Sequence, residues 1–177
     1  KSVKAAESEL QAAIDKKPKL YDLQFALAEF YLKLQMTDKA IAALTSVSDE
    51  RDVELEGLRA KTKLADIYVS RGDVKQAQAL LDAVLEEAPN DADALFVKGK
   101  LAFLKQDDQT AINSLRPVLK DEPRNSEAAL LLAQAHERNN ESELAKETLV
   151  HALEADPMNP KNHLNFANYL ASKNEMA

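Results

Sequence analysis

The fold of this chain is decided by residues 77–89, AQALLDAVLEEAP, because their pattern returns twice at a constant spacing. It returns as AINSLRPVLKDEP at 111–123 and as AKETLVHALEADP at 145–157. Each stretch opens on alanine, carries leucine four and eight residues later, and closes on proline. Self-similarity at a fixed period of about 34 residues indicates a stack of repeated helical hairpins.

Each repeat is expected to hold two amphipathic helices of about 13 residues, joined by a short polar turn. In the repeat at 58–91, the first helix places Leu64 and Tyr68 on one face. This helix should end at Gly72, which adopts a left-handed conformation easily, and Asp73 is expected to cap the next helix. The closing proline cannot continue the second helix, so the helix ends before it.

Small side chains recur at equivalent places of the predicted helices, and this register indicates close helix crossings. On the first helices they are Ala28, Ala65, Gly99, Ala133 and Ala167. On the second helices they are Ala40, Ala77, Ala111 and Ala145. Because a helix of about 13 residues is marginally stable alone in water, stability is expected to come from stacking.

We therefore predict an all-α fold, a right-handed α-solenoid of antiparallel helix hairpins, with residues 1–177 as one solenoid domain. The full repeats are expected at 21–54, 58–91, 92–125 and 126–159. Residues 1–17 should form the second helix of a truncated repeat, and residues 160–173 the first helix of another. Because the chain opens within the pattern, we expect it to be a fragment of a longer protein. Its compartment then stays open: cytoplasmic, or periplasmic or envelope-bound if the full chain carries a signal.

The period is broken once, at residues 48–57, SDERDVELEG, where three extra residues precede Leu58 and Asp52 takes the place of the proline. We predict that the following helix starts about one turn early, near Val53, with acidic side chains at its positive end. Two interpretations of this acidic stretch are open. It is either a solvated helix start, which we favour, or an acidic docking spur.

The charge and composition exclude several function classes. The formal net charge is −7, and acidic and basic residues alternate along the helices, which disfavours nucleic acid and anionic membranes as partners. There is no cysteine, so disulfide scaffolds and thiolate metal sites are excluded. No stretch approaches about 18 uninterrupted apolar residues, so we expect no direct insertion into a membrane.

The sequence offers no constellation that suggests catalysis. His136, His151 and His163 are the only histidines, and they should lie in different layers, with His136 and His163 at core-facing places. A zinc site would need ligands that converge from one face at short spacings. There is also no phosphate-binding glycine loop and no nucleophile elbow. We predict that the chain is not an enzyme and that it has no catalytic, cofactor or metal site.

These repeats resemble the signature of the tetratricopeptide repeat family over essentially the whole chain. In the repeat at 58–91 the matching residues are Leu64, Ala65, Tyr68, Gly72, Ala77, Leu81, Leu85 and Pro89. In the next repeat they are Leu95, Gly99, Ala111, Leu115, Leu119 and Pro123. Lys98 and His136 depart from the pattern, and the family's tryptophan is absent. Residues 115–119, LRPVL, are similar to second helices of alanine-rich bacterial proteins of envelope and exopolysaccharide export, so a bacterial source is expected.

Members of this family bind partners in a concave groove lined by the first helices of successive repeats. Carried over by place, the resemblance implies a partly apolar groove with the candidate partner-binding residues Phe25, Glu29, Leu32, Arg59, Lys63, Phe96, Lys100, Phe103, Leu130 and Gln134. The residues that would close it are Lys161, Leu164, Asn165 and Asn168. Phe25 is expected to face the groove, whereas Phe96 and Phe103 either face it or are buried between helices. The paired lysine and asparagine with which chaperone-tail-binding members hold a terminal carboxylate are absent, and Arg59, Lys63 and Lys100 would supply positive charge at the rim.

The resemblance implies a module for protein–protein interaction, on a fold that serves many unrelated partners. We expect the module to bind a peptide or a helix of a protein partner through apolar anchors in its groove. The alternative is a structural spacer or self-assembly unit of a bacterial envelope or exopolysaccharide export machine, which would form homo-oligomers through the ends of the solenoid. A third interpretation is the non-catalytic arm of an enzyme.

Overall fold

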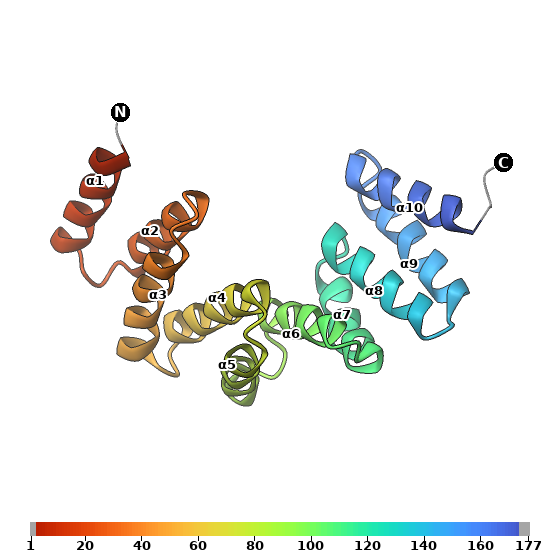
Figure 1. The fold of residues 1–177 in the computed structure, drawn as a ribbon, viewed down its shortest axis with the longest axis horizontal. Helices are drawn as coiled ribbons and strands as arrows, with labels where there is room; N and C mark the ends of the chain where they lie inside the picture. The colour runs from red at the N-terminus through yellow and green to blue at the C-terminus, as the bar shows by residue number, and fades with distance from the viewer. Residues whose placement is uncertain (1–2, 174–177) are drawn as a thin grey trace. The chain divides into compact units, whose positions relative to one another are not determined.

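The computed structural model describes residues 3–173, which form ten α-helices and no strand (Figure 1). In chain order the helices are α1 (Val3–Lys16), α2 (Tyr21–Lys33), α3 (Thr37–Arg51), α4 (Leu55–Arg71), α5 (Val74–Glu87), α6 (Ala92–Leu104), α7 (Asp108–Asp121), α8 (Ser126–Arg138), α9 (Ser142–Ala155) and α10 (Pro160–Ser172). Over these residues the prediction of an all-α fold is confirmed.

The chain divides into two compact units, and we describe each by itself. Unit 1 is Lys1–Pro89 and contains α1 to α5, and unit 2 is Asn90–Ala177 and contains α6 to α10. Each expected full repeat corresponds to one pair of helices that pack against each other, α2 with α3, α4 with α5, α6 with α7, and α8 with α9. The boundaries of the repeats, and one solenoid domain over 1–177, stay predictions.

In each of the four helix pairs, the same kind of turn joins the first helix to the second. One residue adopts a left-handed conformation, and the N–H of the next residue donates to the carbonyl oxygen five positions earlier, which is the Schellman motif. The left-handed residues are Gln35, Gly72, Gln106 and Asn140. The last three are separated by the same interval as the recurring prolines, as the repeat predicts. The interval from Gln35 to Gly72 is longer, so the three extra residues lie between these two turns.

Side-chain caps follow the recurring prolines in unit 2. Asp91, Asn125 and Asn159 each lie two residues after a proline and accept a backbone N–H at 2.7, 3.0 and 3.1 Å. Asp107 caps α7 in the same way at 3.1 Å, and this hydrogen bonding lowers the pKa of its carboxyl. Asp73 stands at the N-cap position of α5, as predicted, but its side chain makes no capping hydrogen bond.

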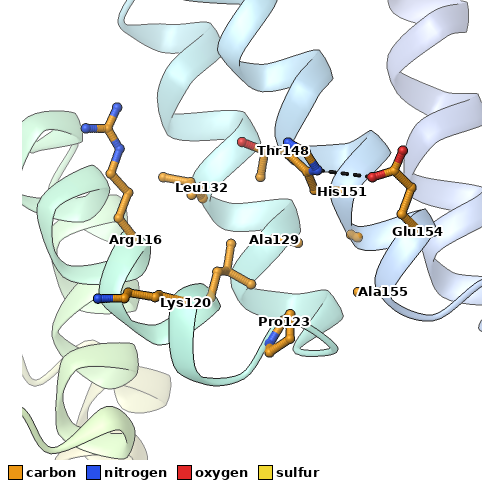
Figure 2. A pocket seen from close by; sticks show the side chains of 11 residues that line it. Arg116, Lys120, Pro123, Ala129, Leu132, Thr148, His151, Glu154 and Ala155 are labelled. Carbon is orange, nitrogen blue, oxygen red and sulfur yellow. Dashed lines mark hydrogen bonds and ion pairs between the residues drawn. The ribbon is translucent and has the colours of Figure 1, made fainter.

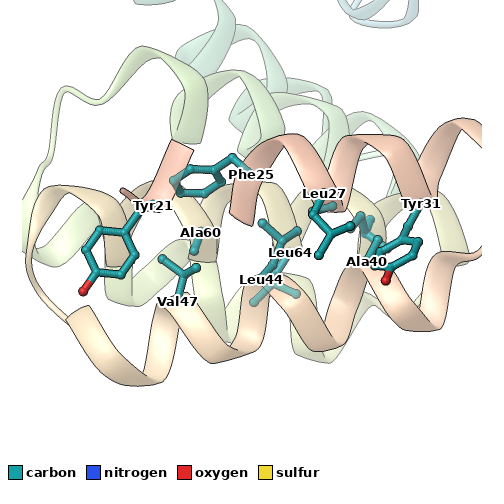
Figure 3. Close-up of a cluster of buried hydrophobic side chains, with 11 residues drawn as sticks. Tyr21, Phe25, Leu27, Tyr31, Ala40, Leu44, Val47, Ala60 and Leu64 are labelled. Atoms are coloured by element: carbon teal, nitrogen blue, oxygen red, sulfur yellow. The ribbon is translucent and has the colours of Figure 1, made fainter. Parts of the chain in front are cut away.

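The core of unit 1 lies between α2, α3 and α4 (Figure 3). Its buried apolar side chains are Tyr21, Phe25, Leu27, Ala28, Tyr31, Ala40, Leu44, Val47, Ala60, Leu64 and Ile67. Both tyrosine hydroxyls find an acceptor at the edge of this cluster, as buried hydroxyls usually must. Tyr21 donates to Glu50 at 2.8 Å, and Tyr31 donates to Glu7 at 2.8 Å. The second hydrogen bond ties α1 to the core.

The core of unit 2 is centred on α7 and α8. Its buried apolar side chains are Ala102, Ala111, Ile112, Leu115, Val118, Ala128, Leu132 and Ala135. Besides its sequence neighbours, α8 also contacts α6 and α10, so the first helices of unit 2 lie next to one another. This arrangement positions the candidate site described below.

The predicted register of small residues is largely confirmed. Ala40, Ala77, Ala111 and Ala145 are fully buried on the second helices. Gly99 is buried on α6, where an added Cβ would lie 2.6 Å from the side chain of Leu115. The prediction is wrong for Ala167, which is exposed on α10.

The break in the period is a tight turn between α3 and α4. Asp52 ends α3 with a φ of 31°, and its carbonyl oxygen lies so close to Gly57 that a Cβ there would be 2.4 Å away. The next helix starts early relative to Leu58, as predicted, but it begins at Leu55, two residues after Val53.

Asp52, Glu54 and Glu56 of this turn form ion pairs with nearby cations of the protein. Arg51 forms ion pairs with Glu54 and, at 3.7 Å, with Glu56. Lys61 donates to Asp52 at 2.6 Å. Exposed ion pairs of this kind contribute only about 0–1 kcal/mol to stability. Because these acidic side chains already have partners within the protein, the ion pairs favour the interpretation as a solvated helix start over that as an acidic docking spur.

We expect Gly57→Ala to destabilise the protein by about 1–3 kcal/mol, because the added methyl group would overlap the backbone of Asp52. This cost outweighs the roughly 1 kcal/mol that alanine gains over glycine inside a helix. Urea denaturation measures the difference, with the exposed Ser70→Ala on the same helix as the control. A Gly57→Ala protein that is as stable as the wild type would show that the turn moves freely.

Candidate functional site

In unit 1 the expectation that Phe25 faces an open groove is not met. Its side chain is 2% exposed and belongs to the core between α2, α3 and α4. Arg59 of α4 covers the ring, with its guanidinium carbon 4.2 Å from the ring centroid. The same guanidinium donates to Asp22 at 2.9 Å. The arginine therefore holds α2 and α4 together and is not a free positive charge.

The other candidates of unit 1 lie on the same two helices. Lys63 of α4 pairs with Glu29 of α2 at 3.4 Å, so both charges are engaged within the protein. Leu32 is 39% exposed and offers an apolar contact at the end of α2.

In unit 2, Phe96 and Phe103 of α6 are half-buried and pack against the core. Lys100 lies over Phe96 at 5.4 Å from the ring centroid, and Arg138 lies over Phe103 at 3.8 Å. Arg138 also donates to the carbonyl oxygen of Phe103 at 3.0 Å, and Lys100 pairs with Glu127 at 3.6 Å. The rings are thus neither open anchors nor fully buried, and a cation covers the outer face of each.

The last two candidates, Leu130 and Gln134, line an open hollow between α8 and α10. This hollow has a volume of about 300 Å³, and Leu130, Ala133 and Leu149 give it an apolar wall. A second hollow of about 580 Å³ adjoins it, since Leu130 and Asn165 line both. We call the two together the α8–α10 trough.

Three amide side chains stand in the polar wall of the hollow between Leu130 and α10. Gln134 comes from α8, and Asn165 and Asn168 come from α10. Within residues 3–173 these three amides make no hydrogen bond to the protein. An amide carries both donors and acceptors, so such a wall can pair with the N–H and C=O groups of a peptide backbone.

An ion pair joins α8 to α10 beside these amides. Glu137 of α8 pairs with Lys173 at 2.5 Å. Burial opposes ionisation of Glu137, but hydrogen bonds from Lys173, Ser142 and Tyr169 outweigh it and hold the pKa of the carboxyl below its ordinary value of 4.5. Sequence reasoning missed Tyr169 and Lys173, although their spacing of four residues places them on one face of α10.

The three histidines lie in different environments. His136 is 2% exposed, and its Nδ1 lies 2.6 Å from a carboxylate oxygen of Glu141, which lowers the pKa of that glutamate. His151 and His163 are exposed, so the core-facing place predicted for His163 is wrong. Among the described residues, no three histidine or acidic side chains are grouped as a metal site.

Comparison with known families identifies the repeats. Two tetratricopeptide repeat models match residues 1–62 and 126–159. The chain is a tetratricopeptide repeat protein. A third model, the second ARM domain of tetratricopeptide repeat protein 21, matches residues 64–140.

Several solved structures resemble most of the chain. A thermophilic tetratricopeptide repeat protein from Thermus thermophilus has a TM-score of 0.77 at 20% identity, over 96% of this chain and 91% of that one. A tetratricopeptide repeat protein from Parabacteroides merdae has a TM-score of 0.73 at 18% identity, over 98% and 68%. MamA from Desulfovibrio magneticus has a TM-score of 0.70 at 20% identity, over 88% and 86%. These likenesses show the fold, an all-α helical solenoid.

One curated relative is a DnaJ homolog subfamily C member 7 homolog from Schizosaccharomyces pombe. It is 27% identical over 114 residues, which are 64% of this chain and 24% of that protein. The chain therefore spans about a quarter of the length of this relative.

Tetratricopeptide repeats generally form non-catalytic scaffolds that bind protein partners. The repeats of this chain accordingly make it a module for protein–protein interaction. Within residues 3–173, no helix is long and apolar enough to cross a membrane.

The lowered pKa of Glu137 has a consequence for stability against pH. The ionised carboxylate stabilises the folded state above pH 4.5, and this contribution is lost as the pH falls through the lower folded pKa. We expect Glu137→Gln to be less stable than the wild type at neutral pH, and the difference to shrink in acid. Urea denaturation from neutral to acidic pH measures it, with Glu147→Gln on the exposed face of α9 as the control. A difference that is constant with pH would contradict the assignment.

Proposed function

We propose that this tetratricopeptide repeat module binds an extended peptide segment of a protein partner in the α8–α10 trough. The main observation in support is that an apolar wall at Leu130 lies beside the amides of Gln134, Asn165 and Asn168, which have no hydrogen-bond partner in the described part of the chain. An apolar surface open to water is a common mark of an interaction site.

The chemistry of the trough suits a peptide in an extended conformation. Such a peptide exposes unpaired N–H and C=O groups along its backbone, whereas a helix has already paired them. The three amides can receive these groups, and a side chain of the peptide can enter the hollow beside Leu130. The hollow beside Leu130 has a volume of about 300 Å³, which can accept a side chain, and the adjoining hollow of about 580 Å³ leaves room for the rest of the peptide segment.

The remaining candidate residues are proposed as outer contacts. In unit 2, Phe96, Lys100 and Phe103 belong to α6, which contacts α8. In unit 1, Leu32 and the ion-paired Glu29, Arg59 and Lys63 are proposed as a separate contact surface of that unit alone. Phe25 is not proposed, because its ring is buried.

The alternative of a spacer or self-assembly unit predicts a different behaviour in solution. Homo-oligomers would gain mass as the protein concentration rises, and sedimentation velocity at several concentrations detects this. A peptide-binding module in the absence of peptide keeps a constant mass.

We expect Leu130→Glu to weaken peptide binding by at least about tenfold, because it places a charge against the apolar wall of the trough. The measurement is selection of extended peptides from a displayed library on the wild type, followed by titration of the selected peptides against the variant. Leu130 lies outside the buried cluster of unit 2, so the variant should fold, and circular dichroism checks that it does.

The matched control is Met158→Glu, which adds the same charge at a side chain that is 89% exposed and outside the trough. It should leave binding unchanged. Selected peptides that bind Leu130→Glu as tightly as the wild type would overturn the proposed site.

A further inference from the structure

A second trough of unit 2 lies between α7 and α9 (Figure 2). It has a volume of about 610 Å³, and Leu119, Leu132 and Ala152 contribute to its apolar floor. It shares no lining residue with the α8–α10 trough. We call it the α7–α9 trough.

The two walls of this trough differ in charge. Arg116 and Lys120 stand on the α7 side, one helical turn apart (Figure 2). On the α9 side, the carboxylate of Glu154 is paired with His151 at 3.2 Å. The acid of the trough is therefore engaged along its own helix, while Arg116 and Lys120 lie on the opposite wall with their charged groups directed away from Glu154 (Figure 2).

The two cations have no hydrogen bond or ion pair to any residue in 3–173. Arg116 exerts only a longer-range attraction on Glu141, where it helps to lower the pKa of that carboxyl. This contrasts with Arg59, Lys63 and Arg138, each of which is paired with an acid. The charges of Arg116 and Lys120 are thus not paired with an acid of residues 3–173 at the surface of α7.

The repeat itself does not require these cations. In the preceding repeat, the equivalent positions hold Asp82 and Glu86, which carry the opposite charge. In the following repeat, the position equivalent to Arg116 holds Val150. The folding of a helical pair in this family therefore tolerates acids here, and the positive charge calls for another explanation.

We propose that the α7–α9 trough binds an acidic amphipathic helix of a protein partner. Its apolar stripe lies on the floor formed around Leu119 and Leu132, and carboxylates four residues apart pair with Arg116 and Lys120. Each wall is a helix of 14 residues, about 20 Å long, which accommodates a docked helix of similar length. Charge complementarity selects the acidic partner, since a basic helix would be repelled by the α7 wall.

The test is a displayed library of helical peptides with a leucine stripe and variable charged positions, selected on the wild type. We expect the enriched peptides to be acidic, and their affinity to fall with added salt. The deciding variant is Arg116→Asp/Lys120→Glu, which installs the residue types found in the preceding repeat and is expected to fold. It should lose at least about tenfold in affinity for the enriched peptides.

Two further variants isolate the surface. The control Lys19→Glu/Lys75→Glu makes the same change in net charge at exposed positions outside the trough and should bind normally. Thr148→Trp fills the trough without changing its charge and should abolish binding. Circular dichroism of all variants verifies that they are folded.

The outcomes separate this proposal from the peptide site between α8 and α10. Enriched peptides that are neutral or basic, or that bind the Arg116→Asp/Lys120→Glu protein normally, would overturn the α7–α9 trough as an acidic-helix site. Peptides lost only on Leu130→Glu would support the proposed function and contradict this inference. The wild type could instead associate with itself, and the Arg116→Asp/Lys120→Glu variant could lose this association. The α7–α9 trough would then bind a second copy of the chain, and the proposed acidic partner would be wrong.

Discussion

Everything in this structure depends on how closely neighbouring helices can cross. The helices, from 13 residues in α2 to 17 residues in α4, are too short to be stable alone, so each must bury one face against the next. Fully buried alanines on the second helices, and Gly99 against Leu115, permit that approach. Because interiors are close-packed, these positions fix the spacing of the helices and thereby the width of both troughs.

The same packing decides which side chains remain available to a partner. On the first helices, cations lie over aromatic rings and pair with acids of the neighbouring helix, as Arg59 does with Phe25 and Asp22. Such contacts are individually weak but they remove free charge and open aromatic surface from that face. Within residues 90–173, the side chains left without a partner in the two troughs include the amides of Gln134, Asn165 and Asn168 and the cations Arg116 and Lys120.

The sequence predicted the features that follow from periodicity, and it missed those that depend on contacts between layers. Spacing alone located Gly72 as a left-handed turn and the alanines at the helix crossings. It could not show that Phe25 is buried beneath Arg59, because the two lie far apart in the sequence and on different helices. The sequence predicted only part of the hollow between α8 and α10, since it did not point to Tyr169, which also lines it.

Within each unit the helices contact mainly their neighbours in sequence, and this locality has a kinetic consequence. Chains whose contacts are local have low contact order, so they form their structure quickly and without closing long loops. Such stacks can also open one hairpin at a time, because no distant segment holds a hairpin in place. Occupancy of a trough between two neighbouring helices would therefore slow amide exchange in those helices and leave the rest of the chain to open at its own rate.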